Sequence, residues 1–128
     1  MSKELANDVK DLVDLLTGLE TMVGFKGPSI SEKYQKLYLL LSGDYKFPPY
    51  EIFDWMHISL GTFETCTAIV YSSEHEMPAL GKLLPKLAIR EEEKVALRNV
   101  AILTHKLLGE LVKMATPDVV VSSDIIMN

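Results

Sequence analysis

The side chains able to bind a metal or attack a substrate are few in this chain and lie far apart. His57, His75 and His105 are the only histidines, and none belongs to an H-E-x-x-H or E-x-x-H spacing that would place two ligands one helical turn apart. Cys66 is the single cysteine, which excludes a disulfide within the chain and a cysteine-rich zinc site. In the interior of an expected helix it should behave as a small buried hydrophobic residue. We therefore expect no metal site and no cysteine nucleophile.

The motifs that mark other catalytic sites and phosphate loops are also missing. The sequence has no G-x-S-x-G elbow, no S-x-x-K pair, no G-x-G-x-x-G and no G-x-x-x-x-G-K-[ST]. These absences favour a protein that is not an enzyme, with no catalytic residues and no cofactor.

Basic residues form the most regular charge pattern, at every fourth position from Lys82 to Arg98. The simplest interpretation is a solvated helix face with weak ion pairs. The functional alternative is a site for an anionic, nucleotide-like metabolite between helices or subunits, in which Arg90, Lys94 and Arg98 contact the anion. Its ring would stack on aromatic residues that otherwise belong to the core, namely Tyr34, Tyr38 and Trp55.

Net charge and hydropathy exclude two classes of partner. The chain has 128 residues, 48% of them apolar, and 13 basic against 18 acidic residues give a net charge of −5. This balance argues against nucleic acid, because most nucleic-acid binders rely on attraction to phosphate. No apolar run approaches the roughly 18–20 residues of a membrane helix, and charges interrupt the N-terminus where a secretory signal would be apolar. We predict a cytoplasmic protein that binds neither nucleic acid nor membranes.

The elements that must position these residues are helices. Apolar residues recur every three or four positions in four long segments. These are residues 2–23, about 29–42, about 49–72, and a last segment from Lys86 or Glu91 to Ala115. A short helical piece is expected over residues 78–84, before Pro85. The fold class is therefore all-α: an up-down-like bundle of four main helices plus one short helix. Residues 1–115 form one domain, and residues 116–128 form a C-terminal tail, flexible or docked.

The third helix has two faces of different character. One face is predicted to enter the core because it carries a clear apolar stripe, made of Ile52, Phe53, Met56, Leu60, Phe63, Thr67 and Val70. The opposite face is only weakly polar and carries Ile58, Thr62, Thr65 and Ile69. A helix of this kind is usually packed on two sides. We expect it at the centre of the bundle or at a subunit interface.

Some apolar residues remain after the core stripes are assigned. In the last helix, Val95, Ile102 and Gly109 recur every seven residues outside the expected core arc. A heptad-spaced line of apolar and small residues is typical of a helix–helix contact. Together with flanking and leftover residues this line predicts an interface, composed of Ile58, Ile69, Val95, Arg98, Ile102, His105 and Gly109.

These observations favour a non-enzymatic protein-interaction or regulatory protein, an adaptor or inhibitor that binds a protein partner and associates with itself as a homo-oligomer. The alternative is a small-ligand-binding protein that sequesters the anionic metabolite described above.

Overall fold

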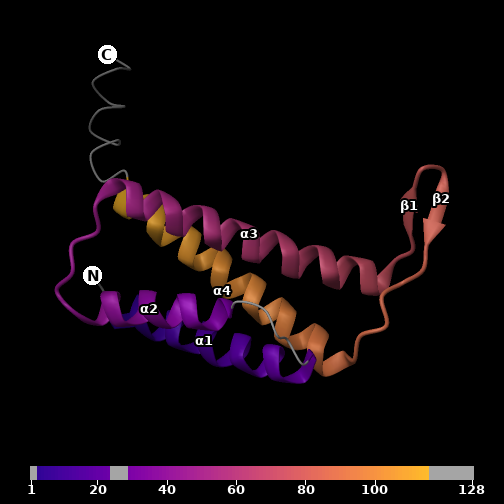
Figure 1. The fold of residues 1–128 in the computed structure, drawn as a ribbon, viewed down its shortest axis with the longest axis horizontal. Coiled ribbons are helices and arrows are strands. Elements are labelled where there is room, and N and C mark those ends of the chain that lie inside the picture. Colours follow the sequence, from indigo (N-terminus) through magenta and orange to yellow (C-terminus); the bar gives the residue numbers. More distant parts are fainter. Residues whose placement is uncertain (1–2, 24–28, 116–128) are drawn as a thin grey trace, which may run out of the picture.

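The computed structural model describes residues 3–23 and 29–115 and shows four helices in the predicted order (Figure 1). They are α1 (Lys3–Val23), α2 (Ile30–Ser42), α3 (Pro49–Glu74) and α4 (Glu91–Ala115). Successive helices run in opposite directions, so the predicted all-α, up-down-like bundle is confirmed. The predicted tail, residues 116–128, lies outside the described residues.

The short helix predicted over residues 78–84 is wrong. This segment is an antiparallel hairpin of β1 (Met77–Ala79) and β2 (Lys82–Leu84), which projects beyond the end of α3 (Figure 1). Its two turn residues, Leu80 and Gly81, have φ angles of 51° and 80°. Two positive φ angles in succession match a tight hairpin turn and break a helix. The apolar spacing suggested a helix, but the local turn chemistry of Gly81 decided the structure.

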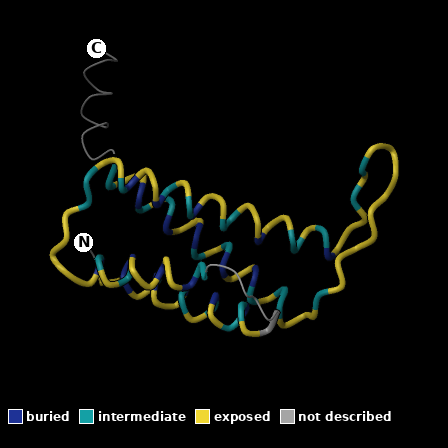
Figure 2. The backbone as a smooth tube through the Cα atoms, in the orientation of Figure 1, coloured by how far each residue is buried: buried dark blue, intermediate teal, exposed yellow. Residues whose placement is uncertain are grey.

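Helix α4 is the central helix of the chain. It packs against α1 on one side and against α3 on the other, and α2 packs against α1. The buried residues, dark blue in Figure 2, are distributed along these helices. From α1 and α4 they are mainly apolar residues spaced three or four positions apart, as expected of the core faces of two helices, namely Leu5, Val9, Leu12, Leu16, Leu19, Leu97, Val100, Leu107 and Leu111. The predicted central position of α3 is therefore wrong, because α4 occupies it. The alternative position of α3, at a subunit interface, stays a prediction.

The core-facing side of α3 also differs from the predicted stripe. Phe53 and Leu60 are 55% and 44% exposed, and Thr67 is exposed as well. Ile52 is buried as predicted, and Met56 and Val70 pack partly buried against the core, but the other buried residues of α3 lie outside the predicted stripe, namely Trp55, Ser59, Cys66 and Ser73. Two serines can enter the core because their hydroxyls are hydrogen-bonded, Ser59 with Tyr34 and Ser73 with the Val70 carbonyl. Hydropathy alone cannot predict that serines are buried. The predicted stripe therefore lay to one side of the face that α3 actually turns toward the core.

Candidate functional site

An apolar groove of about 720 Å³ lies along α3 at the edge of the core, where the buried Cys66 and the half-buried Ile58 and Ile69 line it. This α3 groove has the size of a ligand or side-chain binding site. Its apolar lining comes from all four helices and the segment before α4, and consists of Leu16, Leu19, Ile30, Ile58, Cys66, Ile69, Leu87, Ile89 and Leu97. The sequence did not predict this site, because its walls come from segments far apart in the chain. The one sequence signal was the weakly polar second face of α3.

One wall of the α3 groove is a regular helix seam. It is formed by Ile58, Thr62, Thr65 and Ile69, at positions i, i+4, i+7 and i+11 of α3. This is the spacing with which one helix packs against another. At 1.5 Å per residue the seam is roughly 17 Å long, which corresponds to about three helical turns.

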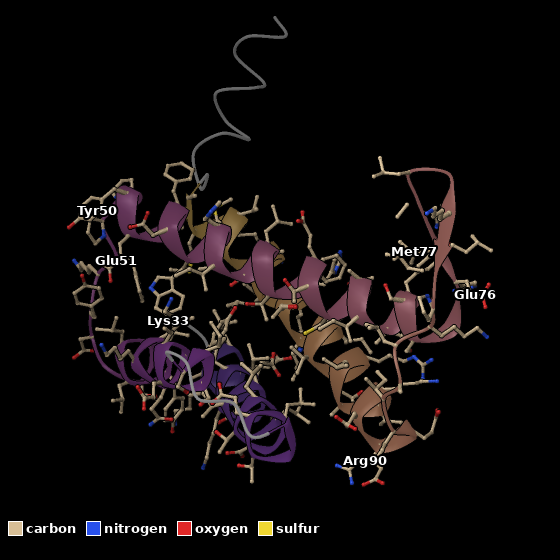
Figure 3. All side chains as sticks on the ribbon, turned by 45° about the vertical axis from the view of Figure 1, so that its right-hand side comes forward. Lys33, Tyr50, Glu51, Glu76, Met77 and Arg90 are labelled. Atoms are coloured by element: carbon tan, nitrogen blue, oxygen red, sulfur yellow. The ribbon has the colours of Figure 1, made fainter. Side chains whose placement is uncertain are left out.

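Charged groups of both signs stand along the same groove. Glu20, Lys33, His57 and Glu93 join its lining, and Lys33 lies on the side of α2 nearer to α3 (Figure 3). An apolar floor with a charged edge suits an amphipathic occupant.

The side chain of Tyr34 joins α2 to α3 beside the groove. It is fully buried, and its hydroxyl donates to Thr62 Oγ1 at 3.0 Å and lies 3.4 Å from Ser59 Oγ. Its ring contacts Trp55 with 5.8 Å between centroids. Burial raises the pKa of the Tyr34 hydroxyl. This residue therefore fixes the spacing of the two helices that flank the groove.

Cys66 lies in the floor of the α3 groove as a free, buried thiol. Burial raises its pKa to about 11, so the thiol stays protonated at neutral pH. It contributes apolar surface rather than a reactive thiolate.

The Glu20 carboxylate fastens α1 to the beginning of α2. It accepts hydrogen bonds from the Ser31 N–H at 2.9 Å and from the hydroxyls of Ser29 and Ser31 at 2.8 and 3.1 Å. Ser29 caps α2 by accepting a hydrogen bond from the Glu32 N–H. Burial raises the pKa of Glu20, but the hydrogen bonds, first that of the Ser31 N–H, outweigh burial and the pKa lies below its ordinary value.

Replacing Glu20 with Gln should lower the free energy of unfolding at pH 7 by about 1 kcal/mol, the usual value of a helix cap. Because the folded pKa is depressed, the contribution of Glu20 is present above its unfolded pKa, about 4.3, and is lost as the pH falls through the folded value. Urea unfolding of both proteins between pH 7 and pH 3 measures this. The two curves should converge in acid, and a constant difference across the range would contradict the assignment.

The structure divides the predicted interface residues between two surfaces. Ile58 and Ile69 are half-buried in the α3 groove. Val95, Ile102 and Gly109 are exposed on α4 and do not line that groove. The remaining two lie at the contact between α3 and α4: Arg98 pairs with Glu74, and the His105 ring contacts Phe63 with 5.7 Å between centroids. The predicted residues thus do not form one patch.

The three predicted anion contacts all have carboxylate partners. Arg90 pairs with Glu93 at 3.0 Å, and Lys94 pairs with Glu91 at 3.7 Å. Arg98 pairs with Glu74 and, at 3.9 Å, with Glu91. Figure 3 shows Arg90 at the start of α4. An anionic ligand would have to replace these carboxylates.

The aromatic residues predicted to stack on such a ligand lie elsewhere. Tyr34 and Trp55 are buried, and Tyr38 is half-buried and packed against the core. None of them lies in the lining of the α3 groove.

Within residues 3–23 and 29–115, no three His, Cys, Asp or Glu side chains gather closely enough to bind a metal ion. No helix in the described part of the chain has the length and apolar character required of a membrane span. No protein-family model matches the sequence, and no curated protein or solved structure is significantly similar to it.

Proposed function

We propose that this protein is a non-enzymatic interaction protein, acting in the cytoplasm as an adaptor or inhibitor, and that the α3 groove binds an amphipathic helix of a partner protein. The observation that carries the proposal is the seam formed by Ile58, Thr62, Thr65 and Ile69, whose spacing is that of a helix-packing face. No described element of the chain fills the groove, and its length accommodates about three turns of a helix.

The far end of the groove supports the same proposal. Leu87 and Ile89 line it from an extended segment, and the Leu87 N–H donates to the Ser72 carbonyl at 3.1 Å. This hydrogen bond ties the segment to the last turn of α3, so this wall of the groove is held in place by the chain itself. A preformed wall reduces the ordering that binding must offset.

A helix is favoured over the anionic metabolite because the groove is apolar and the three predicted anion contacts are paired with carboxylates. The metabolite stays an alternative proposal. It would require Arg90, Lys94 and Arg98 to exchange these partners for the ligand.

Replacing Thr65 with Trp should fill the groove and weaken helix binding. The probe is a displayed library of amphipathic helical peptides of about four turns, with apolar residues spaced to match the seam. Peptides selected on the wild-type protein should lose affinity by about tenfold or more on Thr65→Trp. The matched control is Thr67→Trp, at an exposed position of the same helix outside the groove lining, and it should bind normally. Fluorescence anisotropy with labelled peptides measures both variants.

Two results would overturn the proposal. One is that no helical peptide is enriched while a nucleotide or another small anion raises the melting temperature, which would favour the metabolite. The other is that the selected peptides bind Thr65→Trp and Thr67→Trp equally well.

A further inference from the structure

A second surface of the molecule, separate from the α3 groove, is the outward line of α4. Val95 and Ile102 are 49% and 64% exposed, and Gly109 is exposed one heptad further on. Ile102 also borders a hollow of about 540 Å³ between α1 and α4, which is lined by Leu15 and Leu103 together with the polar Asp11, Asp14 and Asn99. Exposed apolar side chains grouped on one helix face are unfavourable in water and are typical of contact sites.

Within the described residues no neighbour explains the glycine at position 109, and the same holds for Gly18 and Gly61 in other helices. A Cβ atom added at this position would meet nothing within 4 Å, so no described neighbour requires the glycine. Glycine in a helix interior destabilises the helix relative to alanine. Among the helical glycines without such a neighbour, only Gly109 lies in line with the exposed Val95 and Ile102, where it would let a second helix approach closely.

The residues of this line are arranged symmetrically about Ile102. Val95 and Gly109 lie seven residues to either side, and Glu91 and Lys113 lie eleven residues to either side. If a second copy of α4 packs antiparallel with Ile102 at the two-fold axis, Val95 of one copy faces Gly109 of the other. Glu91 then faces Lys113, and both side chains are about three-quarters exposed. A parallel pair would instead bring each charge against its own copy, which is unfavourable.

The neighbouring helix extends the same surface. Phe63 contacts His105 and Glu74 pairs with Arg98, so α3 and α4 run antiparallel side by side. One turn from the Phe63 contact, this alignment brings Leu60 of α3, which is 44% exposed, near the level of Gly109. Leu60 thus lies near the height along the bundle at which Val95 of a second copy would approach Gly109.

We propose that the protein forms a two-fold symmetric dimer in which two α4 helices pack antiparallel, with Ile102 at the axis and Val95 of each copy against Gly109 of the other. The occupant of this surface is a second copy of the chain, because the size and charge of the residues complement themselves under this symmetry. The dimer is independent of the α3 groove and leaves that groove open.

Disulfide cross-linking tests the helix direction. A mixture of Val95→Cys and Gly109→Cys proteins should form a covalent heterodimer on mild oxidation, and Ile102→Cys should form a homodimer. Val95→Cys alone should not, because its two copies would be roughly 21 Å apart along the helices. The wild-type protein is the control for Cys66, whose buried thiol should give no cross-link. Rapid homodimer formation by Val95→Cys alone would overturn the antiparallel arrangement.

Light scattering tests the dimer without cysteines. The wild-type protein should show twice the chain mass of 14.3 kDa. Gly109→Leu should weaken the dimer by about tenfold or more while its helix signal in circular dichroism is retained. Gly18→Leu is the matched control, because Gly18 also lies inside a helix with nothing within 4 Å of an added Cβ, and it should stay dimeric. A wild-type monomer at every concentration, or equal dimerisation by both variants, would overturn the proposal.

Discussion

Replacing Tyr34 with Ala should lower the free energy of unfolding by about 3–5 kcal/mol, the usual cost of removing a large aromatic side chain from a core. Tyr34 is fully buried, contacts Trp55, and is hydrogen-bonded to Ser59 and Thr62. Truncation would leave a cavity between α2 and α3 that well-packed neighbours can close only in part. Because small domains are stable by only about 5–15 kcal/mol, this loss should be visible as a large shift of the urea midpoint.

The matched variant Tyr34→Phe separates packing from hydrogen bonding. It keeps the ring and removes the hydroxyl, so its cost should be only about 1 kcal/mol. Thr62 retains its own hydrogen bond to the Ile58 carbonyl in this variant, which limits the penalty. Equal destabilisation by Ala and Phe would show that the hydroxyl, and not the ring, holds α2 against α3.

The stability of the wild-type protein and that of Tyr34→Phe should depend differently on pH. Burial raises the folded pKa of Tyr34, so its contribution is fully present below the unfolded pKa of about 10 and is lost as the pH rises through the folded value. The wild-type protein should therefore lose stability above about pH 10 more steeply than Tyr34→Phe. Cys66 titrates in the same range, because burial raises its pKa to about 11, but it is present in both proteins and cancels in the comparison.

The helices were predictable from the sequence because their signals are local. Each long helix has an apolar repeat and a stop or cap within a few residues, such as Ser29 before α2 or Gly43 after it. Ser29 and Glu32 have the S-x-x-E spacing typical of a helix start, and Ser29 accepts a hydrogen bond from the Glu32 N–H. The additional anchor, Glu20, was not predictable, since it approaches α2 from another helix.

The errors share a physical cause, which is that hydropathy does not record hydrogen bonds or turn geometry. Ser59 can be buried because its hydroxyl is hydrogen-bonded to Tyr34. With Ser59 turned toward the core, the adjacent Leu60 lies at the surface. Likewise Gly81 allowed a hairpin where the leucines suggested a helix. The groove could not be predicted for a further reason. Its lining residues, such as Leu19 and Ile69, come from distant segments, and only the packing of four helices brings them to one site.

Replacing Val100 with Asp should destabilise the protein by about 3–5 kcal/mol or more, because it places an unpaired carboxylate in the core. Val100 is fully buried on the central helix, which packs against both α1 and α3. The charge would have no cation to pair with in the buried cluster of apolar residues around it. The variant should lose its cooperative thermal transition, or show it at a much lower temperature, when followed by circular dichroism.

The control for this variant lies two residues along the same helix. Ile102→Asp introduces the same charge at a 64% exposed position, so the folded monomer should change in stability by no more than about 0.5 kcal/mol. If the dimer proposed above forms, Ile102→Asp should also reduce the measured mass to that of a monomer and remove the dependence of the melting temperature on protein concentration.

Equal destabilisation by the two substitutions would mean that Ile102 is buried within the chain. The opposite result, a folded Val100→Asp, would show that α4 does not occupy the centre of the bundle. This pair of substitutions therefore tests both faces of α4. Val100→Asp tests the face in the core, and Ile102→Asp tests the face proposed to contact a second molecule.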